Sequence, residues 1–176
     1  MKTLTALAAT VAVVLLSGSV QAQTLGEKTG VNAALGITPS TADFVKEAAG
    51  GDMFEIESSK LAQQKSQGAI KDFATQMITD HTKTSAELTS QAQAASMTLP
   101  NEMGSSLQSE LDKLRTLSGA DFDRQYMDDQ VSAHKDAISL FERYGKGGDS
   151  TKLKSWAVTT LPTLQHHLEM AQGLDK

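Results

Sequence analysis

The sequence predicts an all-α protein, a ferritin-like four-helix bundle with a short extra helix between its second and third long helices. Three observations lead to this prediction. Apolar residues recur at steps of three and four along four segments of about 25 residues, each about 38 Å long as a helix. Short links containing Gly or Ser separate the first helix from the second and the third from the fourth. No β-branched alternating run indicates a strand.

The first 22 residues have the three parts of an export signal. Lys2 supplies a positive charge, residues 4–16 are apolar, and residues 20–22 end in a small alanine suited to cleavage. The apolar run is shorter than the roughly 20 residues that a membrane-spanning helix needs. We therefore predict a signal peptide over residues 1–22 and a soluble periplasmic product without a membrane span.

Charge and cysteine content restrict the partners of the exported chain. Once Lys2 is removed with the signal, 15 basic residues remain against 21 acidic ones, which argues against nucleic acid or an anionic membrane surface as partner. The chain has no cysteine, so neither disulfides nor lipid attachment through cysteine is expected. The sequence identifies no protein partner and is compatible with a homo-oligomer.

Residues 23–39 are rich in Gly, Thr and Ala and predict a flexible leader before a bundle domain over residues 40–176. Ser40, followed by Asp43, indicates the N-cap of a first helix that ends near residue 65. Its stripe consists of Phe44, Ala48, Glu55, Ser59 and Ala62. Gly50–Gly51 lies inside this helix, so either the helix bends there or a neighbouring segment approaches closely.

The second helix, over about residues 69–95, has a histidine within its apolar stripe. Because the link at Gly68 is short, this helix is antiparallel to the first. Its stripe consists of Phe73, Met77, His81, Thr84 and Leu88. An imidazole where Leu or Ile is expected costs desolvation free energy unless it finds a partner. The adjacent Asp80 either accepts a hydrogen bond from a residue that binds the ligand of such a site or is a surface acid.

After Pro100, a stripe of Leu107, Leu111 and Leu114 predicts the short extra helix. The connector that contains it is long enough to cross the full length of the bundle. The second and third helices would then run parallel, as in ferritin-like folds. A plain up-and-down bundle is the alternative.

The third and fourth helices each repeat the embedded histidine. The third, over about residues 119–144, has Met127, Val131, His134, Ile138 and Phe141 on its stripe. The fourth begins at the cap Ser150 and has Leu153, Ala157, Thr160, Leu164, His167 and Ala171 on its stripe. Pro162 predicts a kink just before His167. The neighbouring His166 points off the stripe, toward solvent.

One polar residue of each long helix therefore faces the predicted interior. Counted from the turn between the first two helices, Glu55, His81, His134 and His167 lie about 17, 20, 21 and 11 Å along the axis. His167 is thus about two helical turns away from the other three. Three imidazoles and a carboxylate suit zinc, copper, nickel or iron. A di-iron centre would need Glu-x-x-His pairs, which the chain lacks. We predict a mononuclear transition-metal site with these four ligands, binding zinc, copper or iron.

A competing interpretation assigns the same residues a structural role. The four side chains would satisfy one another in a buried hydrogen-bond network that fixes the helix register. The protein would then be a non-enzymatic envelope protein serving stress tolerance or partner binding. No phosphate-binding loop, Ser-His-Asp arrangement or paired-carboxylate cleft is recognisable, which favours a protein that is not an enzyme.

Four segments carry a resemblance to a known family. They are FVKEAAGGDMFEIESSKLA, FATQMITDHTKTSAEL, FDRQYMDDQVSAHKDAISLF and LPTLQHHLEMA. The chain resembles, over about residues 43–174, a bacterial exported family catalogued as a domain of unknown function, whose members often carry outer-membrane or membrane-protein labels. The resemblance implies a ferritin-like fold and supplies no activity, substrate or cofactor. It places the family's recurrent polar positions on Glu55, Asp80–His81, His134 and His167. Ser59 departs from a position where members have Gly.

Overall fold

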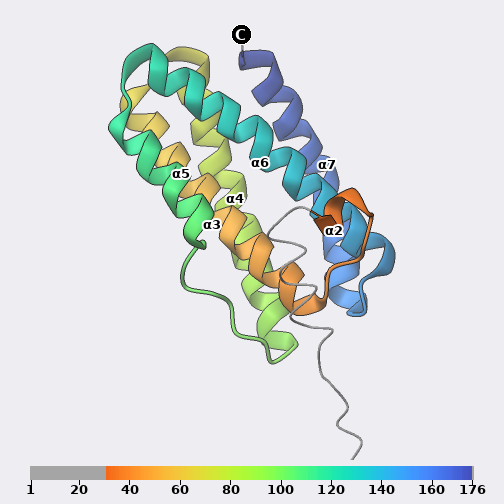
Figure 1. Cartoon of the computed structure of the whole chain (residues 1–176). Coiled ribbons are helices and arrows are strands. Elements are labelled where there is room, and N and C mark those ends of the chain that lie inside the picture. Colours follow the sequence, from red (N-terminus) through yellow and green to blue (C-terminus); the bar gives the residue numbers. More distant parts are fainter. Residues whose placement is uncertain (1–30, 176) are drawn as a thin grey trace, which may run out of the picture.

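The computed structural model describes residues 31–175, and every regular element in this range is a helix (Figure 1). The helices are α2 (Val31–Ala34), α3 (Thr41–Lys65), α4 (Gly68–Ala94), α5 (Ser105–Thr116), α6 (Gly119–Gly147) and α7 (Thr151–Leu174). The all-α prediction is confirmed for this part of the chain. The short helix α5 lies in the connector between the second and third long helices, where its leucine stripe predicted it. The predicted signal peptide lies outside the described residues.

The four long helices α3, α4, α6 and α7 lie side by side, and α5 covers α3 from outside (Figure 1). Helices α3 and α7 each contact both α4 and α6. Where α3 ends, Lys65 Nζ donates to the carbonyls of Leu114 and Leu117, at 3.3 and 2.7 Å, and Ser66 bonds to Asp123 near the start of α6. Helices α4 and α6 therefore both begin at this end and run parallel. The connector between them crosses the length of the molecule.

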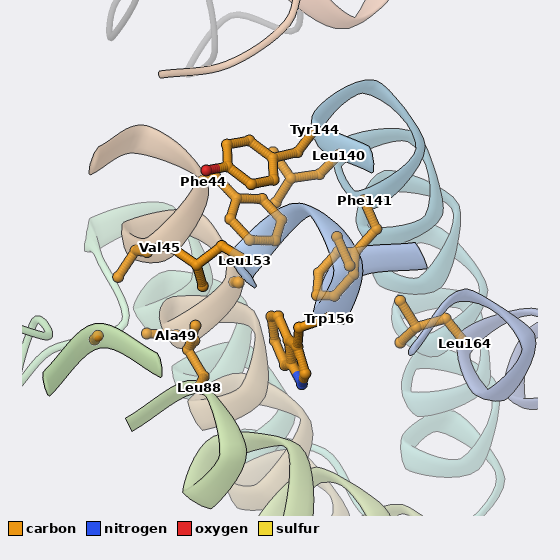
Figure 2. Packing of buried hydrophobic residues seen from close by; sticks show 13 residues of the cluster. Phe44, Val45, Ala49, Leu88, Leu140, Phe141, Tyr144, Leu153, Trp156 and Leu164 are labelled. Carbon is orange, nitrogen blue, oxygen red and sulfur yellow. The ribbon is translucent and has the colours of Figure 1, made fainter. Parts of the chain in front are cut away.

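The core consists of two apolar clusters. The first cluster lies near the turn between α6 and α7 and includes Phe44, Leu88, Tyr144 and Trp156 (Figure 2). The second cluster lies near the turn between α3 and α4; among its members are Phe73, Met77, Leu111, Phe122, Tyr126 and Met127. Along α3, α4 and α6 the apolar residues change from one cluster to the other near mid-length, and along α7 they change after Leu164. Buried polar residues lie between the two clusters, among them Asp52, Glu55, His81, His134 and His167.

Gly50 allows the connector to approach α3 closely. A Cβ atom at Gly50 would lie 2.9 Å from the carbonyl oxygen of Met103, whereas one at Gly51 would meet nothing within 4 Å. Of the two explanations that the sequence left open for the glycine pair, the structure shows the close neighbour, and it shows it at Gly50.

The described part of the predicted leader contacts α6. Within the segment predicted as a leader, residues 23–39, residues 31–34 form α2 and Asn32 is buried. The Ile37 carbonyl accepts a hydrogen bond from Arg143 Nη1 at 2.6 Å. A donor supplied from a distant helix leaves no trace in local sequence periodicity. Residues 23–30 lie outside the described range.

Among residues 31–175, none of the helices combines the length and the apolar character that crossing a membrane requires.

Candidate metal centre

Three histidines from three different helices meet between the two apolar clusters. His81 on α4, His134 on α6 and His167 on α7 have exposed fractions of 4%, 1% and 1%. Their ring centroids are 5.4 to 5.7 Å apart. One ring nitrogen of each can be chosen so that all three lie within 4.8 Å of one another. The structure thus brings His167 to the level of the other two.

Each of the three rings is held from behind by one hydrogen-bond acceptor. The pairs are His81 Nδ1 with Asp52 Oδ1 at 2.7 Å, His134 Nδ1 with the Gln130 carbonyl at 2.8 Å, and His167 Nε2 with Asp80 Oδ2 at 2.8 Å. Because a carbonyl or a carboxylate can only accept, the bonded nitrogen must carry the proton. In a neutral ring the opposite nitrogen then has the lone pair that binds a metal.

These opposite nitrogens are buried and have no hydrogen-bond partner. They are His81 Nε2, His134 Nε2 and His167 Nδ1. A buried polar atom without a partner costs about 1–3 kcal/mol, so three in one place need an explanation. A cation among them would accept all three lone pairs. Tetrahedral zinc holds its imidazole nitrogens roughly 3.3 Å apart, so the rings would have to move closer together than the 4.8 Å within which one nitrogen of each now lies.

Glu55 lies beside the histidines but outside their immediate group. Its side chain is buried, its Oε1 lies 3.7 Å from His134 Nδ1, and its Oε2 has no hydrogen-bond partner. The group of ligand atoms that could hold one ion contains the three histidines and not this carboxylate. The predicted set of four ligands is therefore assembled as three imidazoles with a neighbouring glutamate.

Burial and neighbouring charges give the ionisable groups different protonation behaviour. Burial raises the pKa of Glu55 to about 7, and burial together with the charge of His81 lowers the pKa of His134 to about 3. Burial also lowers the pKa of His167 and outweighs its bond to Asp80. Burial opposes charge on His81 too, but the hydrogen bond to Asp52 and the charge of Glu55 leave its pKa raised. His134 and His167 are thus kept in the neutral form that binds metals.

Asp52 is the site residue that the sequence analysis missed. Its carboxylate accepts from His81 and also from the hydroxyls of Thr84 and Ser85, at 3.0 to 3.1 Å. The signal was present in the sequence, because Asp52 follows Ala48 by four residues and continues the buried stripe of α3 to Glu55.

Asp80 is the hydrogen-bond partner of a histidine, one of the two roles that the sequence left open. Besides His167, it accepts from Gln76 Nε2 at 2.7 Å. Burial acts to raise the pKa of Asp80, but the bonds from Gln76 and His167 outweigh it and lower the pKa. The neighbouring His166 is exposed, as its position off the stripe predicted.

Fold and site together define an all-α protein with a buried, pre-oriented set of three histidines. The chain belongs to the family described as "Domain of unknown function (DUF4142)", whose family model matches residues 26–174. This match confirms the resemblance carried by the four sequence segments. No curated protein and no solved structure matches the chain.

Proposed function

We propose that this protein binds one divalent transition-metal ion through His81, His134 and His167. Two observations support the proposal: on each ring one nitrogen is hydrogen-bonded to an acceptor and the other is buried without a partner, and one nitrogen of each ring lies within 4.8 Å of the other two. Metal-binding histidines are held in this way by carboxylates and carbonyls behind them. Glu55 is a neighbouring carboxylate, with Oε1 3.7 Å from the hydrogen-bonded Nδ1 of His134, and it would become a fourth ligand only after a side-chain movement.

The charges around the rings favour a divalent ion. Asp52 and Asp80 each accept a hydrogen bond from a ligand histidine, whereas burial raises the pKa of the third neighbouring carboxyl group, Glu55, and so favours its protonated, neutral form. Two carboxylates balance an ion of charge +2, whereas a monovalent ion leaves a buried negative charge uncompensated. Imidazole nitrogens suit zinc(II), copper(II) and iron(II).

We place this site in an exported protein with a ferritin-like bundle domain over residues 40–176. The parallel course of α4 and α6, joined by a connector that crosses the molecule, supports that topology. The signal-like pattern over residues 1–22 supports export to the periplasm. Fractionation of expressing cells and the intact mass of the mature chain test this: a periplasmic product that begins at Gln23 is expected, and a full-length cytosolic product would refute it.

Metal analysis and titration calorimetry test the binding proposal. Purified, chelator-treated protein should bind zinc(II), copper(II) or iron(II) with a stoichiometry of one. His167→Gln should abolish this binding, and His166→Gln should leave it intact, because the adjacent exposed histidine shares the helix but not the site. Absence of stoichiometric binding to all three ions would refute the proposal.

The competing proposal is an envelope protein whose polar core only fixes helix register. It predicts that His134→Leu leaves the fold intact or stabilises it and removes no ligand, because a packed apolar side chain can replace a buried polar network. A metal site predicts the same tolerance in the metal-free protein together with loss of metal binding. Calorimetry on the single variant therefore separates the two proposals.

A further inference from the structure

We propose that metal ions reach the three-histidine site at Asp80, between α4 and α7, so that Asp80 sets the rate of metal uptake. This inference rests on the proposed function and adds an access route to it. Its basis is a difference among the acceptor groups beside the three histidine rings.

The side chain of Asp80 is 25% exposed, against 11% for Asp52 and 5% for Glu55. The histidine side chains that these carboxylates contact are only 1–4% exposed. Among these groups, Asp80 is therefore the one that reaches solvent most, and it does so one hydrogen bond away from a ligand ring. A carboxylate in this position attracts a hydrated cation to the surface above His167.

The partners of Asp80 can release it more readily than those of Asp52. Asp80 is held by an exposed glutamine, Gln76, and by His167. Asp52 is held by His81 and by two hydroxyls, in a buried position. Breaking the bond between Asp80 and His167 therefore acts at the more exposed of the two carboxylates, whose side chain is 25% exposed against 11% for Asp52.

Helix α7 is weakened next to this position. Pro162 lies inside the helix, five residues before His167, and lacks the N–H that would bond to the carbonyl of Val158. One missing hydrogen bond in the helix that carries His167 lowers the cost of moving it away from α4. The exposed carboxylate and the weakened helix thus lie along the same pair of helices.

Stopped-flow mixing of the metal-free mature protein with cobalt(II) tests the route, because cobalt(II) bound by imidazoles absorbs visible light. Asp80→Asn should slow the second-order binding rate roughly threefold or more and reduce its dependence on salt. Asp80→Glu, which keeps the charge, should retain most of the rate. Asp52→Asn should weaken affinity mainly through faster release. Asp72→Asn, which removes an exposed charge from the same helix, should leave both rates within about twofold.

The outcomes separate this inference from the proposed function. If the unaltered protein binds no cobalt(II), zinc(II), copper(II) or iron(II), the proposed function fails and the route fails with it. If it binds cobalt(II) and Asp80→Asn changes only the release rate, as Asp52→Asn does, the metal site stands and the route through Asp80 is refuted. Circular dichroism of each variant confirms that the helices are retained.

Discussion

The two apolar clusters and the polar layer between them have opposite effects on the stability of the fold. The polar layer consists of Asp52, Glu55, His81, Gln130, His134 and His167. In the first cluster, Phe44 stacks on Tyr144 with ring centroids 4.0 Å apart and meets Phe141 edge-on at 5.1 Å (Figure 2). Such rings stabilise the fold by burying area and by their mutual geometry. In the polar layer, by contrast, three ring nitrogens and Glu55 Oε2 are buried without partners.

Stability and the candidate site therefore reside in different parts of this chain. Apolar side chains at both ends of the long helices hold them together. Between these ends, the polar layer buries ionisable groups and lowers the stability of the fold. Buried polar atoms without partners destabilise the folded chain, and the proposed metal ion would compensate for this.

Phe44→Ala should destabilise the protein by about 3–5 kcal/mol, because it empties the aromatic part of the first cluster. Urea unfolding measures the change. Metal binding by the folded variant should persist, because the polar layer is built from other side chains. A loss below about 1 kcal/mol would show that the first cluster does not dominate stability.

Zinc(II) at about 100 times its dissociation constant should stabilise the unaltered protein by about 2.7 kcal/mol, because only the folded chain presents the three nitrogens together. Thermal unfolding with and without the ion measures this. His134→Gln should remove the effect, and His166→Gln should keep it. An equal shift in all three proteins would place zinc binding elsewhere.

The pH dependence of the metal-free protein should include contributions of opposite sign from Glu55 and His134. The folded-state pKa of Glu55 is raised from 4.5 to about 7, so between these values the folded protein holds a proton that the unfolded chain lacks, and acidification stabilises it. The folded-state pKa of His134 is lowered from 6.5 to about 3, so below pH 6.5 the unfolded chain takes up the proton and acidification destabilises.

Replacing one of these groups should uncover the other. From pH 6.5 to 4.5, Glu55→Gln should lose stability relative to the unaltered protein by up to about 1.4 kcal/mol per pH unit, and His134→Gln should gain by a similar slope. Urea unfolding across this range measures both variants. Parallel pH profiles for the three proteins would mean that these groups do not titrate as buried residues.

The two adjacent glycines of α3 should respond to alanine with opposite signs. Gly51→Ala should stabilise by about 1 kcal/mol, because it improves helix propensity in open space. Gly50→Ala should destabilise by about 1 kcal/mol, because its Cβ collides with the Met103 carbonyl and outweighs the same propensity gain. Stabilisation by both would show that the connector is not held against α3 beside the polar layer.

Helical periodicity predicted the elements well because each stripe is a local property. Phe44, Phe73 and Met127 are all buried where their stripes placed them. Asp52 was missed because the stripe of α3 was followed through apolar and small residues, and the step from Ala48 to Glu55 passed over an acid at the intervening turn. Polar residues at stripe positions deserve the same weight as the apolar ones in such a chain.

The axial position predicted for His167 was wrong because the distance along the helix was counted from an unsuitable reference point. Counting from the turn between α3 and α4 assumed that α7 ends level with that turn. The short turn between α6 and α7 is the better origin, because it places the start of α7 next to the end of α6. From there His134 and His167 lie about 20 and 24 Å along the axis, within one helical turn. The connection from Ile37 to Arg143 had no sequence signal at all.

The three histidines are divided unequally between the two helical hairpins, so a bound ion would also connect the hairpins. His81 belongs to the α3–α4 hairpin, whereas His134 and His167 belong to the α6–α7 hairpin. An ion bound by all three histidines would therefore link the two hairpins. It would close a loop of about 53 residues between His81 and His134. Restraining a loop of that size in the unfolded chain is worth about 4 kcal/mol when a disulfide does it. In a chain without cysteine, the proposed metal ion would supply a cross-link that a chelator opens and an added ion closes again.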